Sequence, residues 1–66
     1  MNTDTAFEAL VKNRYAWVKA GLPERNRWRF LFMFKHNKNI RQDTKTKYLK
    51  RAGFMLKNEP IWESPF

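Results

Sequence analysis

The sequence predicts a small all-α domain, in which three helices are followed by an irregular C-terminal tail. Apolar residues recur at helical spacing in three stretches, which are separated by a glycine turn or by a polar connection. Two of the three prolines lie in the last seven residues, where they disfavour a further helix. A chain of 66 residues forms one domain with a small core. Because it has no cysteine, aromatic packing or a bound partner must supplement that core.

The first helix is expected from about residue 6 to residue 20. Thr5 and Glu8 form a capping-box pattern, in which their side chains satisfy free amides at the start of the helix. Gly21 suits the left-handed residue that ends such a helix. An approximate i, i+3, i+4 stripe predicts the buried side chains, namely Phe7, Leu10, Val11, Trp17 and Val18.

The second helix is expected over residues 23–36, after a tight turn at Gly21 and Leu22. Pro23 lacks an amide hydrogen and is therefore favoured at the first position of a helix. The apolar side chains assigned to the core are Trp28, Phe30, Leu31 and Phe34. At about 100° per residue, four other side chains fall within about 60° of one another on the opposite face, namely Arg25, Arg29, Phe32 and His36.

A third helix is expected over residues 41–52, capped by Asn39 with Gln42 or Asp43 and ended by Gly53. Its buried side carries Tyr48, Leu49 and Ala52, and its exposed side carries Lys45, Lys47, Lys50 and Arg51.

The tail covers residues 53–66 and allows one short strand at residues 54–56. Pro60 and Pro65 argue against any further regular structure. We expect Ile61 and Trp62 to pack back onto the helices, because burial of a large apolar side chain contributes about 1.5–3 kcal/mol.

The net charge of +8 is concentrated in the middle of the chain. From Glu24 to Arg51 there are ten basic residues and two acidic ones, Glu24 and Asp43. Such a field attracts polyanions, of which nucleic acid is the commonest soluble one. The alternative is a solubilising surface, although solubility alone does not need clustering of one sign.

Enzyme chemistry is not expected from this composition. His36 is the one histidine, Ser64 the one serine, and cysteine is absent, so neither a Ser-His-acid nor a Cys-His arrangement is available. We expect no metal, no cofactor and no small-molecule substrate.

The acidic N-terminus is unlike a signal peptide, and the longest apolar run, Phe30 to Phe34, is too short to span a membrane. A cysteine-free chain fits a reducing cytoplasm.

A helix, a glycine turn and an arginine-rich second helix follow the plan of a helix-turn-helix, whose second helix lies in the DNA major groove. Arg25, Asn26 and Arg29 are the candidates for reading bases, since guanidinium pairs with guanine and carboxamide with adenine. Phe32 is suited either to a thymine methyl or to closing an apolar face against the tail. Arg27 points toward the core, where it either contacts phosphate or extends past apolar neighbours. The remaining candidates for phosphate contacts are His36, Lys38, Lys45, Lys47 and Lys50.

Residues 13–54 resemble the repressor-like helix-turn-helix domains of phage and mobile-element regulators. The resemblance depends on Ala20-Gly21-Leu22-Pro23 as the turn, Phe34-Lys35-His36-Asn37 at the end of the basic helix, and Tyr48-Leu49-Lys50-Arg51-Ala52-Gly53-Phe54 as the packing helix. Trp17 stands where such domains usually have a small residue. The resemblance implies double-stranded DNA as the partner and a role in transcription regulation or recombination. Because one reading helix covers a single half-site, we also expect a homodimer or a partner protein.

Three other functions predict different surfaces. A protein-interaction module, such as a small phage-type inhibitor of an acidic partner, needs a compact exposed aromatic patch. An RNA-binding protein needs exposed aromatic rings that stack on unpaired bases. An interfacial membrane helix combines aromatic and basic residues against anionic lipid.

Overall fold

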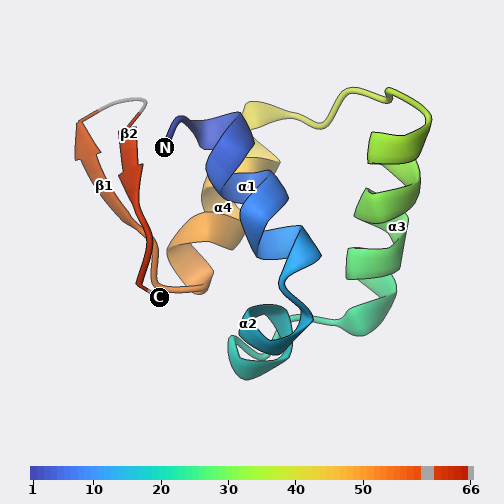
Figure 1. Cartoon of the computed structure of the whole chain (residues 1–66), viewed down its shortest axis with the longest axis horizontal. Coiled ribbons are helices and arrows are strands. Elements are labelled where there is room, and N and C mark those ends of the chain that lie inside the picture. The colour runs from blue at the N-terminus through green and yellow to red at the C-terminus, as the bar shows by residue number, and fades with distance from the viewer. Residues whose placement is uncertain (59–60, 66) are drawn as a thin grey trace.

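The computed structural model describes residues 1–58 and 61–65, which form four helices and a C-terminal β-hairpin (Figure 1). The elements are α1 (Thr3–Lys12), α2 (Arg14–Lys19), α3 (Glu24–Lys35), α4 (Gln42–Arg51), β1 (Met55–Asn58) and β2 (Ile61–Glu63). The chain is therefore mostly helical, as predicted, with a small antiparallel sheet in addition. Within the described ranges, no helix is both long and apolar enough to cross a membrane.

The prediction of one helix over residues 6–20 is wrong, because the helix is interrupted at Asn13. Asn13 has extended backbone angles (φ −96°, ψ 91°), and its side-chain Oδ1 accepts a hydrogen bond from the Ala16 amide at 3.1 Å. It therefore caps α2, which leaves in a new direction (Figure 1). The break also changes the helical phase, so Val18 is exposed although the continuous stripe placed it in the core.

The start of α1 also differs from the prediction. Asn2 caps the helix, since its Oδ1 accepts a hydrogen bond from the Thr5 amide at 2.7 Å. Glu8 instead accepts a hydrogen bond from Lys12 one turn later, at 2.7 Å. Thr5 is therefore inside the helix, and the predicted capping box does not form.

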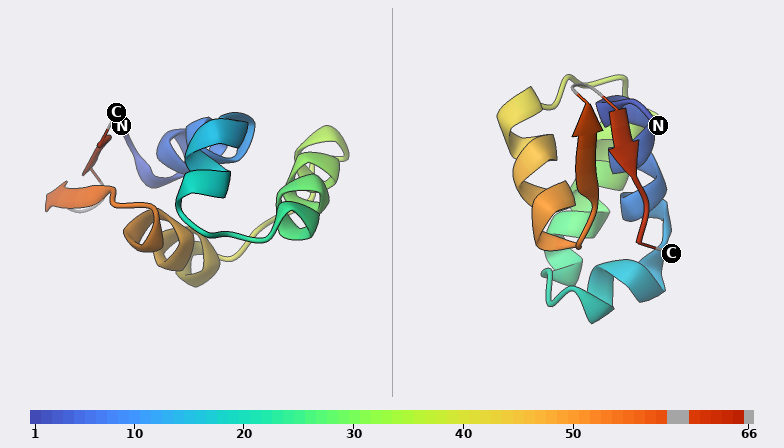
Figure 2. Two further views of the ribbon diagram at one scale, coloured as in Figure 1. Left: turned by 90° about the horizontal axis from the view of Figure 1, so that it is seen from below. Right: turned by 90° about the vertical axis from the view of Figure 1, so that its left-hand side faces the viewer.

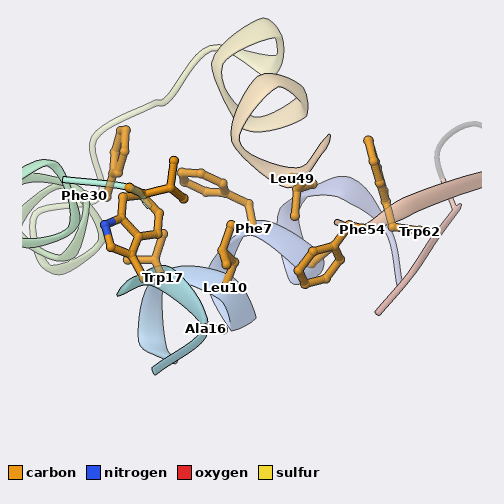
Figure 3. Close-up of a cluster of buried hydrophobic side chains, with 11 residues drawn as sticks. Phe7, Leu10, Ala16, Trp17, Phe30, Leu49, Phe54 and Trp62 are labelled. Carbon is orange, nitrogen blue, oxygen red and sulfur yellow. The ribbon is translucent and has the colours of Figure 1, made fainter. Parts of the chain in front are cut away.

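The core extends along α1, which packs against α2, α3, α4 and β2. Figure 3 shows it as a band of side chains from Phe30 at one end to Trp62 at the other, with Phe7 and Leu10 between them. The Phe7 and Phe30 rings meet edge to face with centroids 5.1 Å apart. Leu49 of α4 is fully buried, as predicted. Dense aromatic packing therefore stabilises this small domain.

Trp28 does not join the core as predicted, because its neighbour Arg27 occupies the inward position on α3. Arg27 is only 8% exposed, whereas Trp28 is 62% exposed. Phe30 is buried, and Leu31 and Phe34 are half-buried. Figure 1 shows α3 at one end of the molecule, where one side of the helix is covered and the other faces solvent.

The turn glycines have the conformations that the sequence predicts. Gly21 (φ +75°) follows α2, and Gly53 (φ +91°) follows α4. The start of α4 differs, because Arg41 is the N-cap residue and makes no side-chain capping bond. The prediction that Asn39 caps this helix is therefore wrong.

The tail contains a hairpin, in which Leu56 of β1 lies opposite Trp62 of β2. The expectation that the prolines prevent regular structure after the first strand is wrong, because β2 lies between them in the sequence. Trp62 packs back onto the helices, and its indole Nε1 donates a hydrogen bond to Thr3 Oγ1 at 2.8 Å. Ile61 is exposed instead, since neighbouring strand residues point to opposite faces. Figure 2 shows the hairpin beside α1 and α4, with the N-terminus next to β2.

Candidate nucleic-acid interface

A groove between α3, α4 and the turn before α3 combines two cavities of about 310 and 240 Å³. Asn26 and Tyr48 line both cavities, and the Asn26 amide nitrogen donates a hydrogen bond to the Tyr48 hydroxyl at 3.0 Å. The Tyr48 ring is stacked on the buried Trp17 indole, with centroids 5.3 Å apart. This bonded pair therefore forms a fixed polar boundary between the two halves of the groove.

Four cations line this basic groove. Arg29 and Arg41 line the larger cavity, and Lys47 and Arg51 line the smaller one. None of the residues lining either cavity is acidic. The four cations form no ion pair with any described residue, so their charges remain available to an anion.

The spacing of α4 explains why these side chains gather. Thr44, Lys47, Tyr48 and Arg51 follow an i, i+3, i+4, i+7 pattern and therefore share one helix face. From Arg41 to Arg51 the chain advances about 15 Å at about 1.5 Å per residue. One DNA strand rises about 3.4 Å per phosphate, so this length matches several successive phosphates.

The outer face of α3 carries the surface that the sequence predicts. Arg25, Arg29, Phe32 and His36 are all exposed, with Phe32 at 57%. The Phe32 and His36 rings are in contact, with centroids 4.2 Å apart. Phe32 therefore does not close an apolar face against the tail. Trp28 joins this surface, which is more aromatic than the sequence suggested.

The three candidates for reading bases occupy different positions. Arg25 is exposed, and Arg29 lies between the outer face of α3 and the basic groove. Asn26 is half-buried and bonded to Tyr48, so part of its hydrogen-bonding capacity is already used.

Arg27 and Lys45, two predicted phosphate contacts, have structural partners instead. Arg27 Nε donates a hydrogen bond to the Val11 carbonyl at 2.9 Å, and its Nη1 donates to Glu24 at 2.8 Å. This burial agrees with the alternative that Arg27 extends past apolar neighbours. The Lys45 side chain is only 13% exposed and bonds to Asp4 at 2.7 Å, which corrects its expected place on the exposed side of α4. Neither cation is available to a ligand in this arrangement.

The bond from Lys45 to Asp4 has an electrostatic effect on the carboxyl group. Donation by the Lys45 ammonium, together with a hydrogen bond from Gln42 at 3.1 Å, lowers the pKa of Asp4 below its ordinary value. This cluster connects α1 to the start of α4 and is therefore part of the fold.

The remaining predicted phosphate contacts are exposed but lie on different surfaces. Lys47 lines the basic groove, whereas Lys50 is exposed elsewhere on α4. Lys38 lines a separate cavity with Glu8, and His36 lies against Phe32. The structure therefore brings together only part of the predicted set.

Arg41 and Arg51 were not among the predicted site residues. The signal for Arg51 was present, because it follows Thr44, Lys47 and Tyr48 at helical spacing. That stripe could be recognised only if α4 was known to face the start of α3.

Comparison of the chain with protein-family models, curated proteins and solved structures found no match.

Proposed function

We propose that the protein is a small DNA-binding protein of the cytoplasm that takes part in transcription regulation or recombination. In this proposal, the edge of α3 that carries Arg25 and Arg29, next to the basic groove, enters the major groove of double-stranded DNA, and the basic groove holds one phosphate backbone. The observation that carries it is the basic groove itself, which is lined by four cations that form no ion pair with any described residue and by no carboxylate. Three of these cations lie along the stretch of about 15 Å from Arg41 to Arg51.

The chemistry of the groove suits phosphate. Guanidinium groups bind phosphate oxygens with two parallel hydrogen bonds, and three of the four cations are arginines. The helix order also supports the proposal, since α2, the glycine turn and α3 follow one another as in a helix-turn-helix. Arg25 and Arg29 then face the base edges, where an arginine pairs best with guanine.

The test is the dependence of duplex affinity on salt. We expect the logarithm of the association constant to fall with the logarithm of salt concentration with a slope of about −3 to −4, because each neutralised phosphate contributes about −0.9. Arg51→Ala and Arg41→Ala should each reduce the slope by about one unit. Lys12→Ala is the matched control, because Lys12 is exposed but paired with Glu8 and lines neither cavity. A wild-type slope near zero on every duplex would refute the proposal.

An acidic protein partner is the second candidate function. The observation in its favour is the exposure of Trp28 and Phe32 beside arginines, because Trp and Arg are frequent hot-spot residues in protein interfaces. Absence of any nucleic-acid binding in the same titrations would favour this function.

A further inference from the structure

Three aromatic rings follow one another along the exposed side of α3. Trp28, Phe32 and His36 are four residues apart, so each lies about 6 Å farther along the helix than the one before. Trp28 and Phe32 are 62% and 57% exposed, and His36 is also exposed. We refer to these three residues as the aromatic ladder.

The Trp28 ring, the first of the ladder, is in contact with a buried cation. The Arg27 guanidinium lies over the Trp28 ring, 5.4 Å from its centroid. Arg27 is itself buried and bonded to the Val11 carbonyl, so it is a fixed support for the indole. A ring that is held in place and yet largely exposed loses little conformational entropy when it binds a flat ligand.

The charges around the ladder are positive. Arg25 and Arg29 lie on the same side of α3, and neither forms an ion pair within the described part of the chain. Glu24, the acidic residue of this helix, is bonded to Arg27 and lies 3.6 Å from Arg14. Exposed rings among free cations are the combination that binds single-stranded nucleic acid, since the rings stack on bases and the cations contact phosphates.

Paired bases do not offer their faces to such rings, because those faces are stacked inside the duplex. An apolar protein surface fits the ladder less well, since arginines are interspersed with its rings and would lose solvation on burial. The ligand that uses both features is a nucleic acid with unpaired bases.

We infer that the aromatic ladder stacks on unpaired bases beside the duplex, so that the preferred ligand is a duplex with a single-stranded extension. This inference rests on the proposed function for the duplex part. The helical phase of α3 is consistent with one side binding the duplex and the other stacking on unpaired bases. Asn26, Arg29 and Met33 face the basic groove, whereas Trp28 lies on the other side of Arg25.

The experiment compares three ligands with the same duplex sequence, namely a blunt duplex, a duplex with a single-stranded DNA tail, and a duplex with an RNA tail. We expect a tail to raise the affinity at least about five-fold for each stacked base. Trp28→Leu should abolish this gain and leave the blunt-duplex affinity unchanged, whereas Trp28→Phe should keep most of it. Tyr15→Leu is the matched control, because Tyr15 is another exposed ring with a neighbouring cation, Lys19, but lies on α2.

Tryptophan fluorescence gives a second measurement on the same samples. Trp17 and Trp62 are buried, so quenching by a tailed ligand reports on Trp28. Quenching that is present in wild type and absent in Trp28→Phe supports the inference, and the tail chemistry that gives it shows whether DNA or RNA is preferred. Thermal melting of each variant checks that the fold is intact.

The two proposals fail in different ways. If the blunt duplex binds but a tail adds no affinity, or if Trp28→Leu weakens blunt and tailed ligands equally, the inference is overturned and the DNA-binding proposal stands. If the blunt duplex does not bind but the tailed ligands bind and quench Trp28, the ladder is supported and the duplex proposal fails. Absence of binding to all three ligands overturns both.

Discussion

Replacement of Arg27 by methionine tests whether this cation serves the fold or a ligand. Methionine keeps the length and the apolar volume of the side chain but removes both hydrogen bonds, to the Val11 carbonyl and to Glu24. We expect Arg27→Met to destabilise the domain and to leave the duplex affinity of the folded protein unchanged.

The size of the effect follows from the groups that lose a partner. A hydrogen bond to a charged group contributes about 1.5–3 kcal/mol when it is buried. The Glu24 side chain is 33% exposed, so water partly compensates for the lost hydrogen bond from Arg27. The Oε2 atom of Glu24, however, is buried with no hydrogen-bond partner among the described residues. We therefore expect a loss of about 2–3 kcal/mol, from a total of about 3–10 kcal/mol for a chain of this length.

The assay is thermal and urea unfolding of Arg27→Met beside Arg25→Met. At about 4–8 °C per kcal/mol, Arg27→Met should lower the melting temperature by about 8–24 °C. Arg25→Met is the control on the same helix, because Arg25 is exposed and forms no ion pair with any residue that the structure describes, and it should change stability by less than about 0.5 kcal/mol. If Arg27→Met melts like wild type but binds duplex more weakly, Arg27 is a ligand contact and the reasoning from its burial is wrong.

Three further predictions concern the site, the core and the electrostatics. Arg29→Ala should weaken binding to a cognate duplex by about 1–3 kcal/mol with little change in melting temperature, and unchanged affinity in a direct titration would contradict its role. Leu49→Ala should cost about 2–5 kcal/mol in urea unfolding because it leaves a cavity at a fully buried position; a wild-type midpoint would place the core elsewhere. Asp4→Asn should cost less than about 1 kcal/mol at neutral pH, since Asp4 is largely exposed. Because the folded state lowers the pKa of Asp4, its stabilisation is present above the ordinary carboxyl pKa and is lost as the pH falls through the lowered value. Melting temperatures of Asp4→Asn and wild type should therefore converge in acid, and a constant difference at all pH values would rule out this carboxylate as the cause.

Local signals in the sequence predicted α3, α4 and their turns well. The left-handed conformations of Gly21 and Gly53 follow from the absence of a side chain, which is a property of the residue itself. The hairpin was missed beyond its first strand because β2 has only three residues and no alternation that distinguishes it from a loop. Its position depends on the burial of Trp62 against Thr3, a contact between residues 59 positions apart.

For the cations of the candidate site, too, local signals were predicted correctly and contacts between distant residues were not. Composition alone indicated a basic surface between Arg25 and Arg51, but it could not show which charges were already paired. The partner of Lys45 is Asp4, which is 41 residues away, so no local pattern connects them. Arg51 became part of the groove only because α4 packs near the turn that follows α2.

The errors at Asn13 and at Trp28 have one physical cause. A helix leaves its last carbonyl groups without partners inside the helix, and α1 ends at Lys12 because Asn13 begins a new helix. One of those free carbonyls belongs to Val11, and the Arg27 side chain supplies its donor. An interpretation that continues the first helix through Asn13 leaves no free carbonyl there and therefore gives the buried Arg27 guanidinium no acceptor at Val11. Once Arg27 takes the inward position, Trp28 must turn toward solvent, which is how the break in α1 places an exposed tryptophan on the candidate interface.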